Sequence, residues 1–265
     1  LCLIWDERLM LALFGLISGI GLYEYHQLFT SKHRLNYSPA ISAVYGTISF
    51  FILIFPWAYE DETGLNGFYH SGIHLIILIS CYGVFQLIIK RKHFISNLSL
   101  VFMGACYIII PLYIGATIHL SERGGTPLLL GVFLLVWTND TFAYITGNLF
   151  GKHKLLEKIS PNKTWEGFIG GLAFTVLAGY FFDLFLQNDS IVQGTSFWMI
   201  SALIIAPAAV LGDLFESALK RKQNVKDTGN IMPGHGGILD RFDAVLFAIP
   251  FFYLWEMIYQ YFIHI

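Results

Sequence analysis

Charged side chains are scarce in this chain of 265 residues. Asp, Glu, Lys and Arg together make up 13% of it, whereas a soluble globular domain carries roughly 25%. Four long stretches contain none of them, namely residues 35–59, 63–89, 93–121 and 190–212. Because a helix needs about 20 apolar residues to cross the hydrocarbon core of a bilayer, this shortage argues against a soluble fold and favours a bundle of transmembrane helices.

Cysteine pairs and alternating strand patterns are also missing. The three cysteines, Cys2, Cys81 and Cys106, show no CxxC spacing, so we expect small buried apolar residues and not a zinc motif or a disulfide framework. The short stretches of alternating polarity that mark outer-membrane barrels are absent. The first residue is Leu and not Met, so we expect a further N-terminal segment to precede it.

Eight apolar stretches predict an all-α, polytopic transmembrane bundle, with nine spans if the preceding segment contains one more. When the loops are assigned alternately to two sides, 14 of the 16 Lys and Arg residues fall on one side, which is predicted to be cytoplasmic. We expect residues 1–125 to be a scaffold for dimer or lipid contacts and residues 126–265 to be catalytic, with two cytoplasmic loops. The predicted spans are 9–29, 39–58, 71–89, 98–118, 127–149, 168–186, 197–219 and 242–263.

Six carboxylates gather toward the predicted cytoplasmic side. A carboxylate inside a bilayer costs several kcal/mol unless it is paired, metal-bound or hydrated. Their spacing places two pairs one helical turn apart, which suits a cluster of oxygen ligands for Mg²⁺ that also bridges substrate phosphates. The alternative is a set of helix-end carboxylates in water. The six are Asp140, Asp213, Glu216, Asp227, Asp240 and Asp243.

Basic residues and glycines surround these acids. Lys226 stands beside Asp227, and Arg241 stands beside Asp240. The general preference of Lys and Arg for cytoplasmic loops does not explain why acids and bases alternate here. A site that binds a metal ion and a polyphosphate does explain it. The glycine-rich turn 234–237 offers backbone N–H groups to phosphate. Within it, His235 fits a general base, a phosphate donor or a turn residue.

Residues 217–243 carry a serine, a Lys-Arg pair, a Lys-Asp pair, His-Gly-Gly and Asp-Arg-Phe-Asp at fixed spacing. This pattern, with Asn139-Asp-Thr-Phe-Ala-Tyr and Ser160-Pro-Asn-Lys-Thr-Trp, resembles the signature of the phosphatidate cytidylyltransferases, or CDP-diacylglycerol synthases. The resemblance implies transfer of the cytidylyl group of CTP to phosphatidate, giving CDP-diacylglycerol and pyrophosphate. It also implies Mg²⁺ with a second, monovalent cation, a homodimer, no nucleic-acid partner, and a bacterial inner membrane with the active site facing the cytoplasm.

The resemblance also assigns roles to individual residues. Because a phosphatidate nucleophile is already ionised, no strong base is required, and His235 is a weaker choice for one. Asp227 is left open between metal binding and structure. The predicted metal ligands are Asp213 and Asp240, then Asp243 and Asp140; the predicted catalytic residues are Asp213, Lys226, Asp227, Asp240, Arg241 and Asp243. The predicted substrate-binding residues are Asn139, Ser160, Lys163, Ser217, Lys220, Arg221, Gly234, His235, Gly236 and Gly237.

Two other functions fit parts of the pattern. A CTP-dependent kinase of polyprenol or phytol would release CDP and not pyrophosphate. An ion-coupled transporter would use carboxylates as a relay, but such relays usually sit near the bilayer midplane, whereas these acids gather at one face.

Overall fold

The computed structural model describes residues 6–33, 38–59, 65–88, 94–121, 125–186, 194–229 and 236–263, and these residues are overwhelmingly helical. The predicted all-α transmembrane fold is confirmed: six of the described helices are long and apolar enough to cross a membrane. Two shorter apolar helices cover Pro39–Phe55 and Gly72–Tyr82. Each predicted span overlaps one of these eight segments. The six long spans are Glu7–Phe29, Ile95–His119, Thr126–Phe150, Trp165–Phe182, Thr195–Gln223 and Leu239–Phe262.

The chain divides into two compact units. The first unit comprises Leu1–Leu120 and Gln223–Arg241, and the second comprises Ser121–Lys222 and Phe242–Ile265. The segment that follows the seventh predicted span therefore groups with the N-terminal helices, and the division falls inside the first turn of the last helix.

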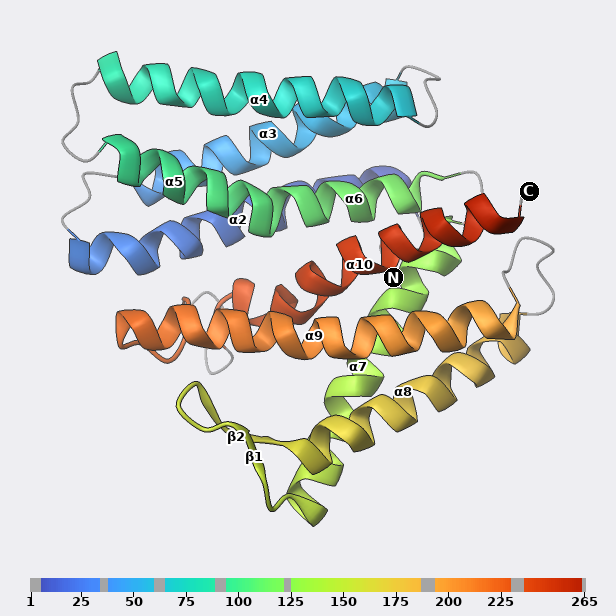
Figure 1. Ribbon diagram of the computed structural model, residues 1–265. Coiled ribbons are helices and arrows are strands. Elements are labelled where there is room, and N and C mark those ends of the chain that lie inside the picture. The colour runs from blue at the N-terminus through green and yellow to red at the C-terminus, as the bar shows by residue number, and fades with distance from the viewer. Residues whose placement is uncertain are drawn as a thin grey trace. The chain divides into compact units, whose positions relative to one another are not determined.

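The first unit contains α2 (Glu7–His33), α3 (Pro39–Tyr59), α4 (Leu65–Ile88), α5 (Phe94–Gly104) and α6 (Ile110–His119) (Figure 1). Small residues bring α2 and α3 together. A Cβ on Gly46 would lie 2.8 Å from the carbonyl oxygen of Ser18, and the Ser18 hydroxyl donates to the carbonyl of Gly46 over 3.1 Å. Since backbones approach this closely only at small residues, these positions fix the pairing of the two helices.

A π-helical turn, η1 (Ala105–Ile109), joins α5 to α6. Its last bond runs from the N–H of Ile110 to the carbonyl of Ala105. Pro111, which follows, has no N–H to give to an α-helical ladder, so the wider turn accommodates the proline without interrupting the span.

The second unit contains α7 (Gly125–Phe150), α8 (Trp165–Leu186), most of α9 (Thr195–Gln223) and most of α10 (Leu239–Ile263). Its core surrounds Trp198 of α9, which is fully buried. The Trp198 ring contacts Phe182 of α8 and Phe252 of α10, and it lies against Gly131 of α7. One large aromatic side chain thus ties the four helices of this unit together.

A short antiparallel hairpin connects α7 to α8, formed by β1 (Lys154–Leu156) and β2 (Ser160–Thr164) (Figure 1). Lys154 pairs with Thr164 and Leu156 with Ser160. The sequence predicted only a long polar loop here, so the hairpin is a small addition to the all-α fold. It gives residues 160–163 a defined backbone.

Glycines set the crossing of α7 and α8. A Cβ on Gly167 would lie 2.8 Å from the carbonyl oxygen of Ala143, and one on Gly171 would lie 2.9 Å from Oδ1 of Asn139. The two helices therefore touch through their backbones beside Asn139. This contact fixes the turn of α7 that presents Asp140.

Candidate functional site

The predicted site residues form two sets, one in each unit. The acidic cluster, in the second unit, consists of Asp140, Asp213, Glu216 and Asp243 with Lys163 and Lys220. The loop–helix junction, in the first unit, consists of residues 224–229 and 236–241. Gly234 and His235 lie outside the described residues, so their predicted contacts with phosphate stay predictions.

An ion pair forms one side of the acidic cluster. Nζ of Lys163, on β2, lies 2.7 Å from Oδ2 of Asp213, on α9, with the two side chains 24% and 40% exposed. The hydroxyl of Ser217 donates to Oδ1 of Asp213 over 3.2 Å. Asp140, an exposed residue of α7, is close enough to interact electrostatically with both Lys163 and Asp213. Three elements thus bring one cation and two carboxylates together.

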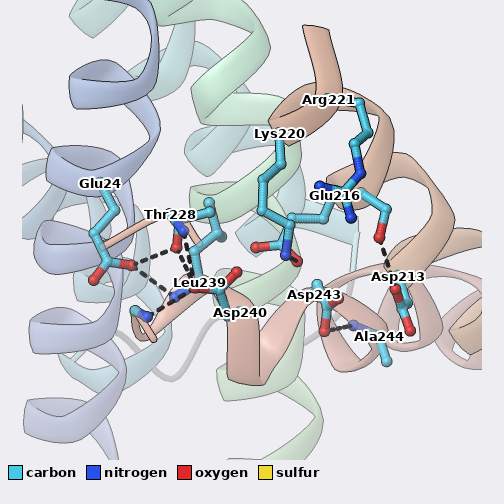
Figure 2. Close-up of polar contacts among 12 residues, drawn as sticks. Glu24, Asp213, Glu216, Lys220, Arg221, Thr228, Leu239, Asp240, Asp243 and Ala244 are labelled. Carbon is cyan, nitrogen blue, oxygen red and sulfur yellow. Dashed lines mark hydrogen bonds and ion pairs between the residues drawn. The ribbon is translucent and has the colours of Figure 1, made fainter. Parts of the chain in front are cut away.

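A second, more buried group lies on α9 and α10. Glu216 is 1% exposed, and its Oε2 accepts a hydrogen bond of 2.9 Å from Nζ of Lys220. Asp243 interacts with Asp213 and Lys220, and it lies within hydrogen-bonding reach of Glu216. Its Oδ1 also accepts from the N–H of Ala244 over 2.8 Å (Figure 2). Glu216 was one of the six carboxylates predicted to gather at this side, although it was not among the predicted metal ligands or catalytic residues.

The acidic cluster has an excess of negative charge. Its four carboxylates and two ammonium groups carry a net charge of two negative units when all six side chains are ionised. A divalent cation that prefers oxygen ligands fits this donor chemistry. Among the described residues, no three His, Cys, Asp or Glu side chains are already grouped to hold a metal ion.

The hairpin that carries Ser160 and Lys163 is held at its base. Glu166, at the start of α8, accepts from the N–H groups of Lys152 and His153 at 3.1 and 3.2 Å, and its Oε1 lies 2.6 Å from Nδ1 of His153. At its tip, Nε of Arg221 reaches the carbonyl of Ile159 at 3.4 Å. These contacts orient Lys163 toward Asp213, and they give Arg221 a role in holding the hairpin that the sequence did not indicate.

Asn139 precedes Asp140 on α7 and is fully buried. Its Nδ2 donates weakly to Oδ1 of Asp140 over 3.4 Å, and its Oδ1 faces Gly171 of α8. These contacts describe a residue that supports Asp140 and the helix crossing; the predicted contact of Asn139 with substrate stays a prediction.

The loop–helix junction is organised by Asp240. Its Oδ2 accepts three hydrogen bonds, from the N–H of Thr228 (3.0 Å), the hydroxyl of Thr228 (2.9 Å) and the N–H of Gly237 (2.8 Å). Gly236 adopts a φ of 81°, a left-handed conformation that favours glycine. A Cβ there would lie 2.8 Å from Oδ2 of Asp240, so glycine is required for both reasons.

Three further predicted residues of the junction are at its surface. Lys226, Asp227 and Arg241 are exposed, as suits side chains that meet a soluble anion. The N–H of Gly237, predicted to cradle phosphate, is engaged by Asp240. Glu24, from α2, also contacts the junction and was not predicted from the sequence: its carboxylate accepts hydrogen bonds from the N–H groups of Ile238 and Leu239 (Figure 2).

Comparisons with known proteins agree with the resemblance seen in the sequence. The sequence model of the Cytidylyltransferase family matches residues 1–259. The chain is 34% identical over 255 residues to the phosphatidate cytidylyltransferase of Haemophilus influenzae, an alignment that covers 90% of this chain and 86% of that protein. It is 34% identical over 203 residues to the enzyme of that name from Bacillus subtilis, covering 77% and 73%. The counterpart from Staphylococcus aureus strain COL is 48% identical over 133 residues, or 49% of each chain.

Proposed function

The chain belongs to the cytidylyltransferase family, and from that membership we propose that this integral membrane protein transfers the cytidylyl group of CTP to phosphatidate. The products are CDP-diacylglycerol and pyrophosphate. The similarity to relatives named phosphatidate cytidylyltransferase extends over most of the chain, which supports the whole reaction and not a shared nucleotide fragment.

The reaction joins two anions. A phosphate oxygen of phosphatidate forms a bond to the α-phosphorus of CTP, and the bond from that phosphorus to the oxygen bridging the α- and β-phosphates breaks, so that pyrophosphate leaves. Such transfers depend mainly on positioning and charge neutralisation and need no covalent protein nucleophile. Lys163 and Lys220 of the acidic cluster, and Lys226 and Arg241 of the junction, are the cations we assign to phosphate oxygens.

The observation that carries this proposal is the Lys163–Asp213 ion pair at 2.7 Å, with Asp140 and Asp243 interacting with the same carboxylate. We assign Asp213, Asp140 and Asp243 as ligands of Mg²⁺, and the role of Asp240 as a ligand stays a prediction. When bound, Mg²⁺ would supply positive charge to the phosphate oxygens. Lys163 then orients Asp213 and is available to meet substrate phosphate.

We further propose that the site faces the cytoplasm of a bacterial inner membrane and that the protein acts as a homodimer. The cytoplasmic assignment is supported by the segregation of 14 of the 16 Lys and Arg residues to one side of the predicted spans. The homodimer is supported by the resemblance of the signature segments to the family.

The decisive experiment measures the products formed by the purified protein in detergent with Mg²⁺ and phosphatidate. CTP labelled at the α-phosphorus should transfer its label to lipid, and CTP labelled at the γ-phosphorus should yield labelled pyrophosphate. Label from the γ-phosphorus in lipid, with CDP released, would identify a lipid kinase instead. No turnover, combined with ion flux in reconstituted vesicles, would identify a transporter.

A further inference from the structure

Glu24 is a buried carboxylate that the proposed reaction does not use directly. It lies in the apolar span Glu7–Phe29 and is 0% exposed. Placing a charged carboxylate in such surroundings costs several kcal/mol unless other groups compensate it. The contacts of Glu24 therefore indicate what the residue stabilises.

Both carboxylate oxygens of Glu24 accept hydrogen bonds from the loop–helix junction. The N–H of Ile238 donates to Oε1 over 3.0 Å, and the N–H of Leu239 donates to Oε2 over 2.8 Å. The hydroxyl of Thr228 lies 3.3 Å from Oε2. Figure 2 shows the Glu24 side chain pointing from α2 toward Thr228 and the start of α10.

These bonds cap α10 from another helix. The first N–H groups of a helix have no partner within it, and a polar side chain just before the helix usually supplies one. Ile238 occupies that place and has no polar side chain to offer. Glu24 takes the N–H groups of Ile238 and Leu239, and Asp240 takes that of Gly237. Two carboxylates thus satisfy three consecutive donors at the positive end of the helix.

The junction is shaped around the Glu24 carboxylate. A Cβ on Gly229 would lie 2.6 Å from its Oε1, and a Cβ on Gly237 would lie 2.5 Å from its Oε2. Thr228 links the two acids, because its hydroxyl is 2.9 Å from Oδ2 of Asp240 as well as 3.3 Å from Glu24. Loss of the Glu24 contacts would therefore change the position of Asp240, because Thr228 and the first turn of α10 contact both acids.

We propose that Glu24 is a positioning residue for the reaction: by capping α10 from α2, it fixes the orientation in which Asp240 and Arg241 meet the substrates. This inference rests on the proposed function for the roles of Asp240 and Arg241. The cap itself is independent of that function, because it is formed by the chain alone.

The test uses Glu24→Gln in the full-length protein in detergent. Glutamine keeps the shape but turns an NH₂ group toward one of two N–H donors, so one bond is lost. Amide hydrogen exchange should become about tenfold faster at whichever of Ile238 and Leu239 loses its acceptor. We expect kcat to fall by about tenfold or more, with the KM for phosphatidate within about twofold of the wild-type value. Unchanged exchange, or unchanged kcat, would overturn the inference.

Matched controls separate this effect from general damage to α2. Glu7→Gln alters an exposed acid of the same helix, and Ser18→Ala alters a buried polar residue of it; both should leave kcat and the exchange at residues 238–239 unchanged. If Glu24→Gln does not fold, Thr228→Val is the variant to measure. We expect it to lower kcat, and a normal kcat would refute the inference. If the wild-type protein transfers no cytidylyl group, the proposed function is refuted. The exchange measurement would still show whether Glu24 caps α10.

Discussion

Asp213 and Asp240 carry the same functional group in different surroundings. Asp213 is 40% exposed and pairs with Lys163. Oδ2 of Asp240 is held by two N–H groups and a hydroxyl of its own loop. Substitution of the first should therefore affect chemistry, whereas substitution of the second should affect chemistry and folding together.

The residue-scale prediction compares Asp213→Asn with Asp240→Asn. Asp213→Asn should lower kcat by about a hundredfold or more, because the site loses a charge at the reacting phosphates, and should leave Tm nearly unchanged, because a half-exposed pair contributes little to stability. Asp240→Asn should lower kcat and also destabilise the fold by about 1–3 kcal/mol, because the new NH₂ group faces hydrogen-bond donors.

Steady-state turnover and thermal unfolding in detergent measure both effects. Arg91→Ala, outside the described residues and between two predicted spans, is the control that should keep normal turnover. Near-normal activity of Asp213→Asn would remove Asp213 from the site, and an unchanged Tm for Asp240→Asn would contradict the structural role of that carboxylate.

The sequence revealed the acids that lie in recognisable motifs. Asp140, Asp213 and Asp243 were identified because they interrupt apolar spans near signature segments, and the structure brings them together. Glu24 was missed because its partners lie more than 200 residues away and it belongs to no local pattern. A buried acid whose donors are distant backbone N–H groups can be assigned only once the tertiary structure is known.

At the scale of elements, the crossing of α7 and α8 depends on glycine. Gly171→Ala should destabilise the protein by about 1–3 kcal/mol, because the added Cβ would overlap the side chain and backbone of Asn139. It should also reduce turnover, because Asn139 adjoins Asp140. Thermal unfolding and kcat are the measurements.

Gly72→Ala in α4 is the matched control for this prediction. A Cβ on Gly72 would meet no atom within 4 Å, so the same substitution should be neutral or stabilise by up to about 1 kcal/mol through helix propensity. Equal Tm values for the two variants would show that the α7–α8 contact is not tightly packed.

Hydropathy predicted the positions of the helices well, but it did not predict the structure of the segments that connect them. Each predicted span overlaps an apolar helix, because the bilayer sets a minimum length that composition records directly. The hairpin between α7 and α8 was not foreseen, because its strands are three and five residues long and depend on Glu166 and Arg221 for support. The π-helical turn was not predicted from the sequence either, since the only local feature that indicates it is Pro111.

At the scale of the whole molecule, orientation in the membrane is the main open prediction. We expect a cysteine at Lys158 to react with a membrane-impermeant maleimide only from the cytoplasmic side, and one at Arg8 only from the opposite side, because of the segregation of basic residues. The background should replace Cys2, Cys81 and Cys106 with alanine. Labelling of both positions from one side would contradict the predicted topology.

The sequence predicted two regions, residues 1–125 and 126–265, but not that a later segment would group with the first. Residues 223–241 follow the seventh predicted span, yet they group with the N-terminal helices. Local patterns give the order of spans but not which of them share a core, since that depends on contacts between residues far apart in the chain.

The cap on α10 also has a consequence for biosynthesis. Leu239 emerges from the ribosome 215 residues after Glu24, so α2 enters the bilayer before any of the three donors described for its acid exists. Until residues 228–239 have been synthesised, these donors are absent, although the Glu24 carboxyl group already belongs to the span Glu7–Phe29. Synthesis of the start of α10 supplies the N–H donors, which couples the final packing of α2 to the arrival of residues 238 and 239.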